Sequence, residues 1–230
     1  MFSPQGSDCA NCSLSLLISQ MVGNEYVASI CKESHRMIFK KGETILRQGI
    51  PATHLVFLHR GIVKFSYESP NGRKVILTVV GSPTILGGAN LFFNDRNLFS
   101  LVALEECEVC LIDNQVLMKI MTREGNFLMT LMQHASATFQ SSIFNFINLA
   151  HKQVAGRISD ILLYLSDNVY KSREFVLSLT RRELSEFAAC SPENVIHTLS
   201  MLNREKILQV SGKEIVILDY EKLAEISKHG

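Results

Sequence analysis

Three side chains near the start of a short apolar repeat are of types that could contact the edges of nucleic-acid bases. Glu193, Ile196 and His197 lie in the segment SPENVIHTLSMLNREKIL. A carboxylate can accept a hydrogen bond from cytosine N4, an imidazole N–H can donate to a guanine or phosphate oxygen, and isoleucine can touch a thymine methyl group. A helix buried in a core has no need of these polar groups, so we expect this helix to meet a polar partner.

The residues around this segment predict two short helices joined by a turn. Thr180 and Glu183, in TRRELSEFAAC, have the spacing of a capping box at the start of the first helix. Ala189-Cys190 forms the turn. Ser191 can act as the N-cap of the second helix, with a proline at its first position, where the missing N–H costs nothing. That helix is expected to end at about Arg204.

The second helix is followed by two strand-like runs around Ser-Gly-Lys in ILQVSGKEIVILD, which predict a β-hairpin. Two helices with such a hairpin behind them form a winged helix-turn-helix, whose second helix enters the DNA major groove. The apolar stripe that faces the first helix is Val195, Leu199 and Leu202. The predicted base contacts, on the other side, are Glu193, Ile196 and His197. The residues placed for phosphate contacts, which set register only, are Thr180, Arg181, Arg182, Ser191 and Asn194.

The first half of the chain has a different pattern. Residues 36–112 contain short runs rich in Val, Ile, Leu and Phe between glycines, such as HLVFLHRG, IVKFSYES and KVILTVVG. The run LVALEECEVCLID adds a further strand pair around a Glu-rich centre. Short strands with frequent turn signals predict an antiparallel β-sandwich or roll.

A heptad-like seam follows the strands. Over residues 124–150 it predicts a long helix with a dimer interface, although a plain amphipathic helix on a monomer has the same period. The predicted domains are therefore a roll over 1–123, a dimerisation helix over 124–151 and a winged helix-turn-helix over 152–230, an α+β fold. In the last domain RISDILLYLSD reads as a helix and REFVLSLT as a strand. The seam residues are Leu128, Met132, Ala135, Phe139, Ser142, Phe146 and Leu149.

Composition limits the possible classes of protein. The chain has 230 residues, 47% of them hydrophobic, so it can bury a core. No apolar run approaches the roughly 18 residues of a membrane span, and the N-terminus lacks the features of a signal peptide. A cytoplasmic location without membrane contact is expected, with the six cysteines reduced. The net charge is +1, so DNA contacts must come from a local patch.

The motifs together resemble the CRP/FNR family, the cyclic-AMP receptor and fumarate–nitrate regulator group of bacterial transcription factors. The resemblance covers almost the whole chain, through KKGETILRQGIPATHLVFLHRGIVKF, NLAHKQVAGRISDILLYLS and LTRRELSEFAACSPENVIHTLSMLNREKIL. It implies a homodimer that binds a palindromic double-stranded DNA site, a roll that senses a signal, a long helix that relays it, and RNA polymerase as a partner. The family's second helix carries a Glu and usually an Arg four residues later. Here these are Glu193 and His197, and histidine lacks the bidentate fork of arginine.

The resemblance also bears on the signal. The cyclic-AMP branch holds its nucleotide with a Gly-Glu and an Arg-Ser pair, where this chain has Gly87-Gly88 and, near the second place, Asn97-Leu98. Arg96 lies close to the second place, and Ser142 matches a pocket hydroxyl of that branch. Without the arginine of the Arg-Ser pair, the anionic phosphate of the nucleotide has no cationic partner in an apolar roll. Cyclic AMP is therefore not expected.

The cysteines resemble those of the oxygen-sensing branch. Cys9-Ala-Asn-Cys12 precedes SLSLL, and EVCLID places Cys110 where that branch has its distant cysteine. The resemblance implies an iron–sulfur cluster or another thiolate-bound metal held by these three. The branch's third N-terminal cysteine has no counterpart here, so the possible fourth ligand is Cys31 or Cys107, with Asp8 as a further alternative.

Other signals and other functions stay open. A dithiol redox switch, haem or nitric oxide sensing, and a small organic effector with no metal centre are alternatives to the cluster. An enzyme built on a roll is not expected, because the chain has no nucleophile motif, no metal-binding histidine spacing and no phosphate-binding loop. A ligand-binding module without DNA binding is the remaining class, and the salt dependence of duplex binding separates it from a regulator.

Overall fold

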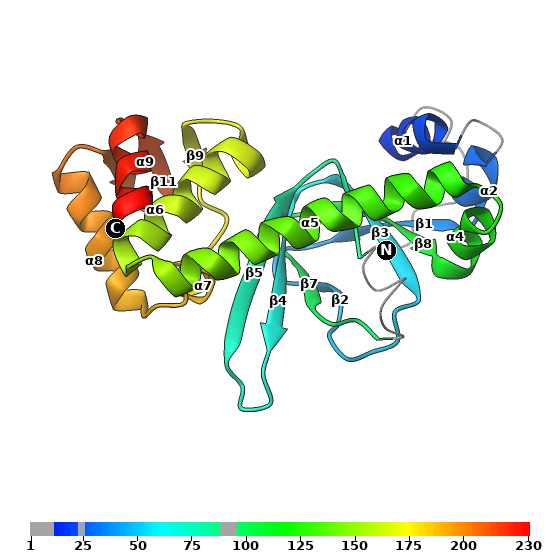
Figure 1. Ribbon diagram of the computed structural model, residues 1–230, viewed down its shortest axis with the longest axis horizontal. Helices are drawn as coiled ribbons and strands as arrows, with labels where there is room; N and C mark the ends of the chain where they lie inside the picture. Colours follow the sequence, from blue (N-terminus) through cyan, green and yellow to red (C-terminus); the bar gives the residue numbers. More distant parts are fainter. Residues whose placement is uncertain (1–11, 23–25, 88–95) are drawn as a thin grey trace. The chain divides into compact units, whose positions relative to one another are not determined.

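The computed structural model describes residues 12–22, 26–87 and 96–230. The chain divides into two compact units (Figure 1). The first unit contains Met1–Val63 and Ser82–Gln140, and the second contains Lys64–Gly81 and Ser141–Gly230. The predicted domains follow chain order, whereas this division assigns the segment 64–81 to the same unit as the C-terminal helices.

Antiparallel strands form the roll that the sequence predicts. One sheet has the order β1-β8-β3-β6 and the other the order β2-β7-β4-β5. The predicted pair in LVALEECEVCLID forms β7 and β8, but these strands join different sheets and do not pair with each other. The strands are β1 (Ser34–Phe39), β2 (Thr44–Leu46), β3 (His54–Arg60), β4 (Ile62–Glu68), β5 (Lys74–Gly81), β6 (Thr84–Leu86), β7 (Ser100–Ala103) and β8 (Cys107–Asp113).

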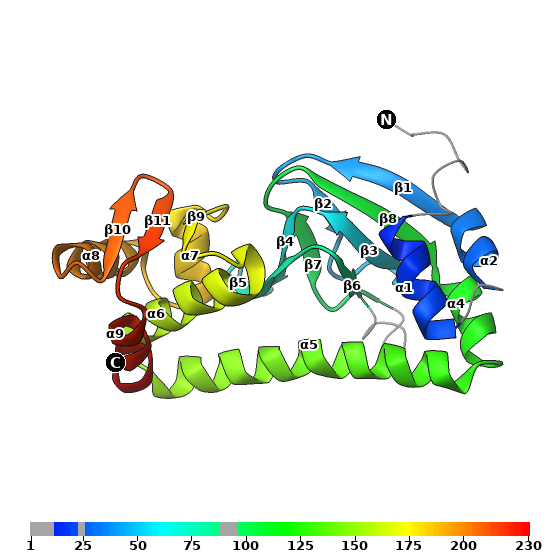
Figure 2. The same cartoon turned by 90° about the horizontal axis from the view of Figure 1, so that it is seen from above.

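Three helices gather at one end of the sheet that contains β1 and β8 (Figures 1 and 2). They are α1 (Ser13–Val22), α2 (Val27–Lys32) and α4 (Asn114–Met121). Their apolar side chains meet those of the sheet in one buried cluster that includes Leu14, Ile30, Phe57, Ile112 and Leu117. Each such side chain contributes about 1.5–3 kcal/mol when fully buried, so this cluster holds the N-terminal helices on the sheet.

Helix α5 (Gly125–His151) is the long helix that the seam predicts. Its first turns join the core of the first unit through Phe127 and Leu131, which are buried. Other large apolar side chains of this helix are exposed to solvent. These are Met129, Met132, Phe139, Ile143, Phe144, Phe146 and Ile147.

The C-terminal part of the second unit contains the predicted pair of helices and the hairpin. Its elements are α6 (Val154–Tyr164), the π-helix η2 (Leu165–Tyr170), β9 (Glu174–Val176), α7 (Arg181–Ala188), α8 (Pro192–Arg204), β10 (Leu208–Ser211), β11 (Glu214–Ile217) and α9 (Tyr220–His229). The three strands form an antiparallel sheet in the order β10-β11-β9. Figure 2 shows this sheet beside α8. Helix α9 has no counterpart in the sequence prediction, although Asp219 caps it by accepting from the Lys222 N–H at 2.9 Å.

Glycines permit the two tight hairpins of this unit. Gly72 between β4 and β5 has φ +78°, and Gly212 between β10 and β11 has φ +58°. Both values lie in the left-handed region, which glycine adopts without a Cβ clash. Among the described residues no helix is both long and apolar enough to cross a membrane.

Candidate nucleic-acid interface and sensor region

The start of α7 is fixed by the predicted capping box. The Glu183 N–H donates to Thr180 Oγ1 at 3.1 Å, and the Thr180 N–H donates to Glu183 Oε2 at 2.7 Å. The Thr180 hydroxyl also donates to Glu183 Oε2 at 2.8 Å. The hydroxyl of Thr180 is therefore engaged inside the cap, and its contact with a DNA phosphate stays a prediction.

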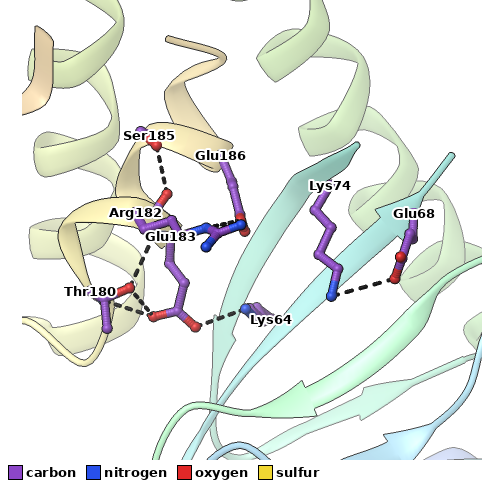
Figure 3. Close-up of polar contacts among 8 residues, drawn as sticks. All are labelled: Lys64, Glu68, Lys74, Thr180, Arg182, Glu183, Ser185 and Glu186. Carbon is purple, nitrogen blue, oxygen red and sulfur yellow. Dashed lines mark hydrogen bonds and ion pairs between the residues drawn. The ribbon is translucent and has the colours of Figure 1, made fainter. Parts of the chain in front are cut away.

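A lysine from strand β4 forms an ion pair with the carboxylate of Glu183. Lys64 of β4 donates from Nζ to Glu183 Oε1 at 2.8 Å (Figure 3). Burial alone would raise the pKa of Glu183. The hydrogen bonds from Lys64 and Thr180 outweigh burial and hold the pKa below its usual value, so the carboxylate is ionised at neutral pH.

The turn between α7 and α8 has a defined geometry. Ala189 adopts the left-handed conformation with φ +47°, and the Cys190 N–H donates to the Ser185 carbonyl at 3.1 Å. Arg157 of α6 donates from Nη1 to the Ala189 carbonyl at 3.1 Å. The turn is thus held both by its own backbone and by α6.

Helix α8 begins as predicted. The Ser191 hydroxyl accepts from the Asn194 N–H at 3.3 Å, and Pro192 occupies the first turn. The predicted stripe of Val195, Leu199 and Leu202 is buried, and Thr198 is buried beside it. The predicted base-contact residues lie on the opposite, exposed side: Glu193, Ile196 and His197.

The ionisation of Glu193 suits a hydrogen-bond acceptor. A hydrogen bond from Ser191 lowers the pKa of this exposed carboxyl group, with a further contribution from its own backbone N–H. The group is therefore an anion at neutral pH, with the acceptor oxygens that contact with a cytosine amino group needs.

The two arginines at the start of α7 differ in their surroundings. Arg181 is half-buried and donates from Nη2 to the carbonyl of Gly212 at the tip of the β10–β11 hairpin, at 2.6 Å. Arg182 is exposed, with its Nε 3.5 Å from a Glu186 carboxylate oxygen. Arg181 therefore positions the wing, whereas Arg182 presents its charge to solvent. Together with Ser191 and Asn194, the predicted phosphate contacts cluster at the first turns of α7 and α8.

In the first unit, an imidazole links α1 to the sheet beneath it. His59 Nε2 lies 3.1 Å from Cys110 Sγ, and His59 Nδ1 lies 3.0 Å from Ser13 Oγ. Burial, with a smaller contribution from Arg36, holds the pKa of His59 below its usual value, although Glu108 acts to raise it. His59 was not among the residues predicted from the sequence, because no spacing signal connects it with a cysteine 51 positions away.

The described cysteines do not form a metal site. Cys110 is buried, and Cys12 packs against the same apolar cluster. Cys31 is half-buried on α2, and Cys107 is buried with its thiol donating to the Ile62 carbonyl at 3.3 Å. Because side chains alternate along a strand, Cys107 lies on the opposite face of β8 from Cys110. Over residues 12–22, 26–87 and 96–230 no three Cys, His, Asp or Glu side chains are grouped to hold a metal ion. Cys9 and Asp8 lie outside these residues.

The residues at the position of the cyclic-AMP branch's Arg-Ser pair have partners within the roll. Asn97 is buried and donates from Nδ2 to the Arg47 carbonyl at 3.1 Å. Arg96 donates from Nη1 to the Gly49 carbonyl at 2.6 Å, and Leu98 is exposed. At the position of that branch's Gly-Glu pair, Gly87 is described, and the residue after it lies outside the described segments.

The antiparallel roll followed by a winged helix-turn-helix defines a class of two-domain DNA-binding regulator. Residues 36–124 match the model of the cyclic nucleotide-binding domain, and residues 156–226 match that of the Crp-like helix-turn-helix domain. The chain belongs to the CRP/FNR family of transcriptional regulators, and it is a CRP-like DNA-binding regulator.

Curated relatives cover most of the chain. The cAMP-activated global transcriptional regulator CRP of Haemophilus influenzae is 27% identical over 178 residues, which are 76% of this chain and 80% of that protein. The CRP-like cAMP-activated global transcriptional regulator of Mycobacterium tuberculosis is 24% identical over 211 residues, 90% of this chain and 94% of that protein. The structure of FixK2 from Bradyrhizobium japonicum shares the fold, with a TM-score of 0.78 at 19% identity, over 84% of this chain and 96% of that one.

Proposed function

We propose that the protein acts as a homodimer that recognises a palindromic DNA site through α8. The observation that carries this proposal is the exposed side of α8, where an ionised Glu193 lies beside Ile196 and His197 at the start of a capped helix. The carboxylate of Glu193, the side chain of Ile196 and the imidazole of His197 can contact base edges. The charged and polar groups at the starts of α7 and α8 can contact phosphates.

Dimerisation is proposed on the apolar face of α5. Among the seam residues, Phe139 is 66% exposed and Phe146 is 71% exposed, and Met132 is also exposed. Leu128 and Leu149 are half-buried, and the side chains of Ala135 and Ser142 are not described. Large exposed aromatic groups in a row on one helix are typical of an interface. A second copy of α5 would bury them and bring two recognition helices to two half-sites about one DNA turn apart.

The test measures oligomeric state and DNA binding together. Sedimentation should give a dimer, and duplex DNA affinity should fall steeply with salt as phosphate contacts are screened. Phe146→Glu should yield monomers with much weaker DNA binding, whereas Val176→Glu, at an exposed apolar residue of β9, should leave both properties unchanged. A monomeric wild-type protein, or binding insensitive to salt, would contradict the proposal.

The signal is proposed to enter at the thiols of Cys12 and Cys110. The support for this assignment is the link from Ser13 through His59 to Cys110, together with the packing of Cys12 against the cluster that contains Cys110. A chemical change at the buried sulfur would disturb how α1 packs on the sheet. The described donors do not complete a site for an iron–sulfur cluster, so the proposal is thiol-based sensing of oxygen, oxidants or nitric oxide, and no step is derived through a metal.

An anaerobic preparation separates the possible signals. Protein prepared with iron supplied is examined for visible absorption, iron and sulfide, and its DNA affinity is measured before and after mild oxidation. An oxidant response in colourless protein that Cys110→Ser abolishes would support thiol sensing. Cluster absorption with bound iron and sulfide would instead show an iron–sulfur centre and overturn the metal-free proposal. A colourless protein with no oxidant response would contradict thiol sensing. It would favour a small organic effector, for which cyclic AMP, named for the relatives but not expected here, is the first ligand to titrate.

A further inference from the structure

Lys64 connects the β4–β5 hairpin to the helix-turn-helix across 119 residues of sequence. Its Nζ lies 2.8 Å from Glu183 Oε1, and the side chains are only 13% and 21% exposed. Figure 3 shows Lys64 reaching from β4 to the start of α7. An ion pair this sheltered from water is screened less by salt than a surface pair. The Lys64–Glu183 ion pair is therefore a specific contact and not an incidental approach of two long, exposed side chains.

A second polar contact ties the same hairpin to α6. The hydroxyl of Tyr164 donates to the Val79 carbonyl of β5 at 2.8 Å and lies 3.2 Å from Thr78 Oγ1. Because the phenol has one hydrogen, Thr78 must be the donor in the second bond. Burial raises the pKa of Tyr164, so the phenol stays protonated. At the end of β5 the backbone passes so close to η2 that a Cβ on Gly81 would lie 3.1 Å from the Val169 carbonyl.

The carboxylate of Glu183 has two separate tasks. One oxygen, Oε2, closes the capping box with Thr180, and the other, Oε1, receives Lys64. The residue that fixes where α7 begins is therefore the residue that attaches α7 to the hairpin. While this contact is made, the base-contact residues Glu193, Ile196 and His197 remain exposed, so the contact does not mask the recognition face.

We infer that the β4–β5 hairpin is a coupling element, and that Lys64 is a positioning residue that holds α7, and with it α8, in the DNA-binding orientation. The inference rests on the proposed function of α8. Strand β4 follows β3 of the roll after Gly61 alone, so a signal that moves the roll strands moves Lys64. Separation of Lys64 from Glu183 releases the helix-turn-helix and lowers the fraction of protein competent to bind, which lowers the apparent affinity by that fraction.

Two variants remove the ion pair while retaining the fold. Lys64→Met keeps the length of the side chain, and Glu183→Gln keeps the capping box, in which glutamine replaces glutamate. The matched control is Lys74→Met on the same hairpin. Its partner there is Glu68 at 3.4 Å, and both of these side chains are more than half exposed (Figure 3).

DNA affinity and amide hydrogen exchange without DNA are measured for all three variants and the double variant. We expect Lys64→Met and Glu183→Gln each to weaken DNA binding about fivefold, within the usual range for coupling between sites. The double variant should be no weaker than either single variant, because one contact is lost in every case. Exchange in β5 and in the first turn of α7 should accelerate together. Lys74→Met should match the wild type in both measurements.

The outcomes separate failure of the coupling from failure of the proposed function. Faster exchange with unchanged DNA affinity would show a structural contact only and would overturn the inference, as would additive effects or equal effects of Lys64→Met and Lys74→Met. If the wild type does not bind duplex DNA, the proposed function fails. In that case, unchanged hydrogen exchange in Lys64→Met rejects the coupling as well. Faster exchange in both β5 and the first turn of α7 would retain only the mechanical link between the hairpin and α7.

Discussion

The first turns of α7 and α8 are built alike and used differently. Each begins at a hydroxyl residue that accepts from a backbone N–H three residues on, and each contains one glutamate. Glu183 is the third helical residue and turns back to close its cap, while Glu193 is the second and stays exposed. A shift of one position decides whether the carboxylate holds the fold together or remains available to a partner.

The largest effect is expected when the engaged glutamate is removed. Glu183→Ala deletes the capping-box acceptor and leaves the sheltered Lys64 ammonium without its carboxylate. The expected cost is about 2 kcal/mol of the free energy of unfolding of the second unit. Denaturant unfolding followed by far-UV circular dichroism measures it. Glu193→Ala, at the exposed position, is the matched control and should leave unfolding unchanged, and equal losses in the two variants would remove the distinction.

The local parts of this comparison were predictable from the sequence. The capping box at Thr180, the N-cap at Ser191 and the wing around Gly212 were all predicted, because each signal is complete within four residues or so of chain. Burial of Val195 and Leu199 followed from helical spacing alone. The structure confirms these elements.

The contacts that position these elements were not predictable. Lys64 reads as an ordinary polar residue of an alternating strand, and its partner lies 119 residues away. Tyr164 likewise meets β5 across 85 residues. Arg181 was expected only at a phosphate, although its guanidinium holds the Gly212 carbonyl. A single sequence specifies the chemical types of such partners and not their pairing, which depends on how the whole chain packs.

The second-largest effect is expected at the exposed Glu193, and it concerns the sequence specificity of DNA binding. Glu193→Ala should reduce discrimination at one base pair of the half-site about tenfold, because the acceptor for a cytosine amino group is lost. Binding is measured against a set of duplexes that differ only at that position. Glu225→Ala, at another exposed carboxylate on α9, controls for the change in charge. An equal change on every duplex would show that Glu193 acts through charge and does not read a base.

A smaller effect is expected at the hydroxyl that caps the recognition helix. Ser191→Ala leaves the Asn194 N–H without its acceptor and should cost about 1 kcal/mol of the free energy of unfolding. Ser191→Gly should cost only a few tenths of a kcal/mol, since glycine is tolerated at an N-cap. Denaturant unfolding of both variants ranks them. If alanine and glycine cost the same, the bond seen at the start of α8 does not contribute to its stability.

The smallest effect on stability is expected at Arg182, and it sharpens the contrast between engaged and available groups. Its guanidinium is 83% exposed and 3.5 Å from Glu186 within the same helix, and such pairs contribute little in water. Arg182→Gln should therefore leave unfolding unchanged and lower the slope of log affinity against log salt by about one, the value for one phosphate contact. Arg181→Gln should instead destabilise the wing, because that guanidinium already donates to Gly212. An unchanged salt slope in Arg182→Gln would show that Arg182 makes no phosphate contact and would leave this role to the other residues predicted for it, which are Thr180, Arg181, Ser191 and Asn194.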